Sequence, residues 1–84
     1  MVAEPQCVRL DVWAADGIEN LGRVISVLVL LDLTPSQLSV RRTASGLKVS
    51  AVLQASSRDT ALCLARLRAL VAVRAAECEP APGG

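Results

Sequence analysis

The sequence predicts an α+β fold in which a four-stranded antiparallel sheet carries two helices on one face. Apolar and polar residues alternate over four short segments, which is typical of half-buried strands, and apolar residues recur every three or four positions over two longer segments, as in amphipathic helices. The predicted order is strand, helix, strand, strand, helix, strand. Right-handed crossovers convert this order into a ferredoxin-like βαββαβ sandwich. A chain of 84 residues suffices for one such domain.

The first half of the chain predicts a strand over residues 7–14 and a helix over residues 18–31. Asp16 is a suitable N-cap for this helix, with Glu19 three residues later as its capping-box partner. Pro35 lies beyond the helix because proline lacks the N–H and disfavours helix at the preceding residue. The predicted core stripe of the helix has steps of three and four residues and comprises Ile18, Leu21, Val24, Ile25, Leu28 and Val29.

The second half predicts strands over residues 36–43 and 47–53, joined by a turn short enough to make them an antiparallel hairpin. A second helix is expected to begin with Ser57 as its N-cap and to end near Leu70. The last strand is expected over residues 71–78. One domain over residues 7–78 follows, and residues 1–6 and 79–84 are expected to be tails.

Composition weighs against two classes of function. The chain has no histidine and a net charge of +1, and Trp13 is its one aromatic residue. It therefore lacks the commonest general base, the aromatic platforms that stack bases and the dense positive field of most nucleic-acid binders. We expect a protein that is not an enzyme and does not bind nucleic acid. Arg41, Arg42, Arg58, Arg66 and Arg68 are expected to be solvated.

The cysteines predict neither a metal site nor disulfides. Cys7, Cys63 and Cys78 are widely spaced, form no Cys-x-x-Cys pair and have no histidine to complete a zinc site. Cys63 is expected to be a small core residue and the others to be reduced thiols. Residues 1–6 do not resemble a signal peptide, and the longest apolar run, residues 27–31, is too short to span a membrane. A cytoplasmic protein without membrane contact is expected.

Two surfaces are candidates for contact with another chain. One is the sheet face opposite the helices, where Trp13 and Val52 are expected to lie. The other is the C-terminal half of the first helix, where Val27, Leu30 and Leu31 lie off the predicted core stripe. The alternatives are a partly exposed tryptophan at a strand end and a fuller core within one chain.

The turn that joins the first strand to the first helix is the most distinctive local feature. Free backbone N–H groups and the positive end of a helix can hold a carboxylate there. However, Asp16 is expected to occupy the cap, and Glu19 adds a negative charge to the first turn. Plain helix capping is therefore the simpler interpretation of these residues.

Residues 10–25, and the approach to the second strand over residues 31–38, resemble an ACT domain. The segments Leu21-Gly-Arg-Val24 and Leu70-Val-Ala-Val73 are most similar to the short, single-domain small subunit of acetolactate synthase. The resemblance covers about residues 6–78. It implies a ferredoxin-like regulatory module that forms a homodimer and binds a large catalytic subunit. It also implies that thiamine diphosphate belongs to that partner, so no cofactor is expected here.

The resemblance further implies an amino-acid effector site between two protomers. The positions that match it are Asp16, Gly17, Ile18, Glu19, Asn20, Gln37 and Leu38. The Pro-Gly pair that effector-binding ACT domains carry in this turn is absent, and Glu19 would repel a carboxylate. A regulatory subunit that does not respond to valine is therefore expected. The alternatives are a free-standing amino-acid-binding dimer and a structural oligomerisation module without a ligand.

Overall fold

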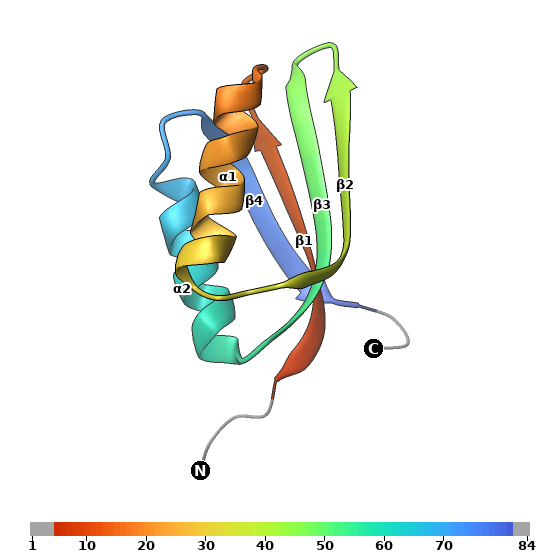
Figure 1. The fold of residues 1–84 in the computed structure, drawn as a ribbon, viewed down its shortest axis with the longest axis vertical. Coiled ribbons are helices and arrows are strands. Elements are labelled where there is room, and N and C mark those ends of the chain that lie inside the picture. Colours follow the sequence, from red (N-terminus) through yellow and green to blue (C-terminus); the bar gives the residue numbers. More distant parts are fainter. Residues whose placement is uncertain (1–4, 82–84) are drawn as a thin grey trace.

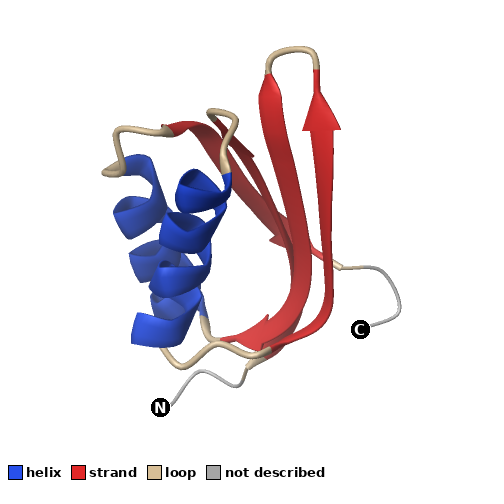
Figure 2. Cartoon of the chain, turned by 45° about the horizontal axis from the view of Figure 1, so that its top comes forward, coloured by secondary structure: helices blue, strands red, loops and turns tan. Residues whose placement is uncertain are grey.

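The computed structural model describes residues 5–81. Its elements follow in the predicted order: β1 (Gln6–Ala14), α1 (Ile18–Leu30), β2 (Pro35–Thr43), β3 (Gly46–Ala55), α2 (Ser57–Arg68) and β4 (Val73–Pro80) (Figure 1). The four strands form one antiparallel sheet in the order β2-β3-β1-β4. Both helices lie on the same face of this sheet (Figure 2). The predicted ferredoxin-like α+β fold is therefore confirmed.

The core lies between the two helices and the central strands. Alternate residues of β1 and β3 point toward the helices, so that Val12 and Val49 are opposite one another and both are buried. Val24 from α1 and Leu67 from α2 belong to the same core cluster and are almost fully buried. Hydrophobic burial of this layer is the main stabilising term of a domain of this size.

The buried face of α1 differs from the predicted stripe. Ile18 and Val29 are 79% and 73% exposed, whereas Val27, which was expected to lie off the stripe, is 7% exposed and belongs to the core. The helix packs beside α2 as well as over the sheet. Its buried face is therefore turned toward α2, relative to the predicted stripe. The face that packs comprises Leu21, Val24, Val27, Leu28 and Leu31.

Both predicted helix caps are wrong by one residue. Gly17, not Asp16, is the N-cap of α1, and no side chain caps that helix, so the Asp16–Glu19 capping box does not form. Ser56, not Ser57, is the N-cap of α2, and its Oγ accepts a hydrogen bond from the Asp59 N–H at 3.1 Å. The side-chain oxygen thereby satisfies one of the N–H groups that a helix start leaves free.

The ends of the outer segments also differ from the predictions. The last strand begins at Val73 because a turn follows α2, and Val71 is fully exposed in that turn. It continues to Pro80, and the Ala81 N–H donates to the carbonyl of Cys7, so residues 79–81 are not part of a tail. Residues 1–4 and 82–84 of the expected tails lie outside the described residues. Within residues 5–81, no helix is long and apolar enough to cross a membrane.

Candidate functional site

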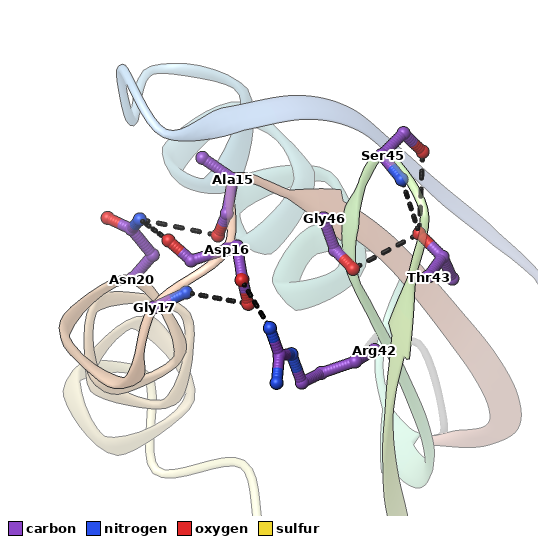
Figure 3. A network of polar contacts seen from close by, with 8 residues as sticks. All are labelled: Ala15, Asp16, Gly17, Asn20, Arg42, Thr43, Ser45 and Gly46. Atoms are coloured by element: carbon purple, nitrogen blue, oxygen red, sulfur yellow. Dashed lines mark hydrogen bonds and ion pairs between the residues drawn. The ribbon is translucent and has the colours of Figure 1, made fainter.

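The turn between β1 and α1 is held by its own side chains. Gly17 adopts φ 125° and ψ 140°, a conformation that favours glycine. The side-chain amide of Asn20 donates to the carbonyl oxygens of Ala15 at 3.3 Å and Asp16 at 3.0 Å (Figure 3). Asn20 therefore ties the first turn of α1 to the loop that precedes it. Ile18 and Glu19 are exposed at the start of the helix.

The carboxylate of Asp16 lies at this helix start and binds two donors. Its Oδ1 accepts from the Gly17 N–H at 3.1 Å, and its Oδ2 is 3.0 Å from Nη2 of Arg42, which comes from β2 (Figure 3). A helix N-terminus together with a guanidinium is an arrangement that binds carboxylates. Here the chain's own carboxylate takes both donors. Arg42 was not among the predicted site residues, although strand alternation places it on the same face as Leu38 and Val40.

The tip of the β2–β3 hairpin supports this region. Gly46 has φ 138° and lies against the end of β1. Thr43 Oγ1 donates to the carbonyl of Gly46 at 3.1 Å, and Nη1 of Arg74 from β4 donates to the carbonyl of Ser45 at 2.5 Å. Contacts from three strands therefore hold the strand end from which Arg42 reaches Asp16.

The structure separates the predicted ligand residues of β2 from those of the turn. Leu38 lies toward the other end of α1, where it lines a groove of about 330 Å³ with Ile25, Val29 and Pro35. Gln37 is opposite Val52 and so points to the other face of the sheet. Within one chain, the seven residues expected to bind an effector do not form a single site.

The edge of the sheet at β2 carries an apolar surface that sequence reasoning missed. Among the described strands β2 pairs only with β3, and every residue of β2 after Pro35 is exposed. Leu38 and Val40 are 45% and 43% exposed on the helix side of the sheet, and Val29 of α1 is also exposed. Backbone donors and acceptors and apolar side chains are thus available along the same edge.

The open sheet face is more polar than expected. Trp13 and Val52 are half-buried there, as the alternation predicted, and Nζ of Lys48 lies 5.3 Å from the centre of the tryptophan ring. Arg9 forms ion pairs with Asp11 and Glu79 on the same face. Charged side chains therefore lie beside both apolar residues of this face, Lys48 next to Trp13 and Arg9 opposite Val52.

The three helix residues predicted as interface residues differ in exposure. Val27 was expected to lie off the core stripe, but it is 7% exposed and belongs to the core, at the base of a groove between α1 and α2. Leu31 is half-buried against the core, and Leu30 is 63% exposed. Leu30 is therefore the one of the three with a large accessible side chain.

The three cysteines are free thiols. Burial raises the pKa of the Cys63 thiol to about 11, and the nearby Cys78 contributes to the shift. Burial also raises the pKa of Cys78, with smaller contributions from the carboxylates of Asp11 and Glu79. Both thiols are therefore protonated at neutral pH. No cluster of three potential metal ligands occurs in the part of the chain that the structure describes.

Comparison with known proteins does not assign the chain to a family. No protein-family model matches the sequence, and a search of curated proteins found no significant match.

Proposed function

We propose that this chain is a non-catalytic, ACT-type regulatory subunit, which forms a homodimer and activates the large catalytic subunit of an acetolactate synthase-like enzyme. The resemblance of its residues to ACT domains, together with the ferredoxin-like fold, supports this assignment. The observation that carries the proposal is the apolar edge formed by Leu38 and Val40 of β2 beside Val29 of α1. Such an edge is suited to pairing with another chain.

A second copy fits this edge in a specific register. With an antiparallel two-fold axis through Ser39, Leu38 of each chain lies opposite Val40 of the other. Gln37 then lies opposite Arg41, so that no two like charges face each other across the pair. In this register the backbone groups that point away from β3 can hydrogen-bond to those of the second copy. The result would be an eight-stranded sheet that buries both apolar edges.

The Asp16–Arg42 pair supports the proposed insensitivity to valine. An amino-acid carboxylate entering at the start of α1 would have to displace the Asp16 carboxylate from the Gly17 N–H and from Arg42. It would also meet the negative charge of Glu19 in the first turn. Both effects oppose anion binding at this position.

One observation keeps a free-standing amino-acid-binding dimer as the second candidate. In the proposed register, Ser36 of one copy lies opposite Arg42 of the other, so Leu38 comes nearer to the turn of the second chain, while Gln37 remains on the open face of the sheet. This candidate predicts that an amino acid stabilises the protein in a saturable way. A structural oligomerisation module would form the same dimer and respond to neither an amino acid nor a synthase subunit.

A synthase assay tests the proposal. Purified large acetolactate synthase subunit from the same cell is titrated with this chain, with and without valine. Saturable activation that valine does not reverse is expected. The matched controls are Val40→Lys, which should weaken activation that depends on the dimer, and Val71→Lys at a fully exposed site away from β2. No activation and no co-elution with the large subunit would refute the proposal.

A further inference from the structure

A second groove lies on the helical layer, between α1 and the end of α2, on the side away from the sheet. Its volume is about 390 Å³. It is lined by Arg23, Ser26, Val27 and Leu30 from α1 and by Arg66, Ala69 and Leu70 from α2 and the turn after it. It is separate from the groove beside β2, which is lined by another face of α1.

The floor of this groove is apolar and accessible. Leu30 is 63% exposed, and Leu70 is half-buried beside it. The hydroxyl of Ser26 donates to the carbonyl of Gly22 at 2.7 Å. This donor is therefore satisfied within α1 and needs no acceptor from a bound partner. Ser26 and Ala69 are also small, so an approaching segment can come close to both helices. Burial of the leucine surface would favour association.

The groove also carries two cations without acidic partners. Arg23 and Arg66 line it, and the ion pairs found within residues 5–81 involve only Arg9 and Arg42 as cations. Their aliphatic stems extend the apolar surface, while their guanidinium groups remain free to bind carboxylates in a bidentate manner. A partner segment that is complementary to this groove has an apolar centre and acidic residues next to that centre.

We propose that this groove is a docking site for an acidic amphipathic helix of a partner protein. A helix whose apolar stripe lies on Leu30 and Leu70 would place flanking carboxylates beside Arg23 and Arg66. A second copy in a two-fold arrangement fits poorly, because it would bring the arginines of both chains together. The inference goes beyond the proposed function, since it concerns a surface that does not involve β2 and names no enzyme.

The test uses two designed peptides and the whole chain. Each peptide is a fluorescein-labelled amphipathic helix with a leucine stripe flanked by glutamate in one version and by lysine in the other. Binding is followed by fluorescence anisotropy, and the binding surface by amide chemical shifts. We expect the glutamate peptide to bind saturably, with shifts confined to α1 and α2, and the lysine peptide to bind at least about tenfold more weakly.

Variants locate the contacts. Arg23→Glu with Arg66→Glu should weaken binding of the glutamate peptide by at least about tenfold, and Leu30→Asp should do the same by removing the apolar floor. All three side chains are exposed, so the fold is expected to tolerate these changes. The matched control is Arg41→Glu with Arg58→Glu, which makes the same change of net charge on exposed residues outside the groove and should leave the affinity unchanged.

Three results would overturn the inference. Equal binding of both peptides would exclude charge recognition, and absence of binding would exclude docking of such a helix. Binding to phosphatidylserine–phosphatidylcholine vesicles in place of the peptide would assign the groove to a lipid surface. None of these outcomes depends on the synthase assay, so this inference and the proposed function can fail separately.

Discussion

Gly46 lies so close to Ala14 that a Cβ atom added to the glycine would be 2.3 Å from the Ala14 carbonyl oxygen. The neighbour is backbone, so it cannot move aside as a flexible side chain could. Gly46 also has φ 138°, which side-chain-bearing residues rarely adopt. This contact joins the β2–β3 hairpin to the end of β1, next to the turn that carries Asp16.

Replacing Gly46 with alanine should therefore destabilise the domain. We expect the free energy of unfolding to fall by about 3 kcal/mol or more, from the backbone strain and the contact together. Urea unfolding followed by circular dichroism measures this change. Gly22→Ala is the matched control, because Gly22 lies within α1 with open space around it. It should stabilise the domain by about 0.5–1 kcal/mol. An equal loss of unfolding free energy in both variants would show that the conformation and close contact of Gly46 are not what makes its replacement destabilising.

Removal of the negative charges at the start of α1 should create an amino-acid site. Asp16→Ala with Glu19→Gly leaves Arg42 and the Gly17 N–H free to bind a carboxylate. We expect saturable heat of binding for L-valine in the double variant and none in the unmodified chain. Adding Arg42→Ala should abolish the gain. If the double variant still shows no binding in calorimetry, the turn is not an effector site blocked by its own carboxylate.

The two adjacent serines before α2 should differ in their effect on stability. Ser56→Ala removes the oxygen that accepts from the Asp59 N–H and should cost about 1 kcal/mol. Ser57→Ala changes an exposed residue that caps nothing and should alter stability by less than about 0.5 kcal/mol. Denaturant midpoints of the two variants make the comparison. A larger loss for Ser57→Ala would place the cap one residue later.

Stability should decline in alkaline solution because of Cys63. The thiol has a pKa of about 11 in the folded chain against 9.0 for an unperturbed cysteine, so the unfolded chain releases its proton first. The free energy of unfolding should therefore fall as the pH rises from about 9 toward about 11. Urea unfolding at several pH values measures the slope. Cys63→Ala should reduce it, and an unchanged slope in this variant would show that other groups cause the decline.

The element order could be predicted because each central strand alternates cleanly between core and open face. The buried side of α1 could not, because nearly every residue from 24 to 31 is apolar and the period does not select a face. Packing against α2 determines which face of α1 is buried, and Val27 lies on that face. The cap of α2 was ambiguous because Ser56 and Ser57 can both accept a hydrogen bond, and only the path of the chain decides between them.

Less of the candidate site could be predicted from the sequence. Asp16 and Arg42 are 26 residues apart and meet only through the packing of β2 and β3 against β1. The turn itself could be located from its glycine and its position before a helix. The apolar edge at Leu38 and Val40 could not, because the alternation of a strand does not reveal whether a helix covers its apolar side.

The proposed homodimer forms through the exposed edge of β2. Sedimentation equilibrium tests it most directly, on the unmodified chain, on Val40→Lys and on the control Val71→Lys. A lysine on an edge strand opposes pairing, so we predict twice the 8.8 kDa chain mass for the unmodified chain and the control, and the single-chain mass for Val40→Lys. An unmodified chain that sediments as a monomer, or a Val40→Lys variant that remains a dimer, would rule out pairing through β2.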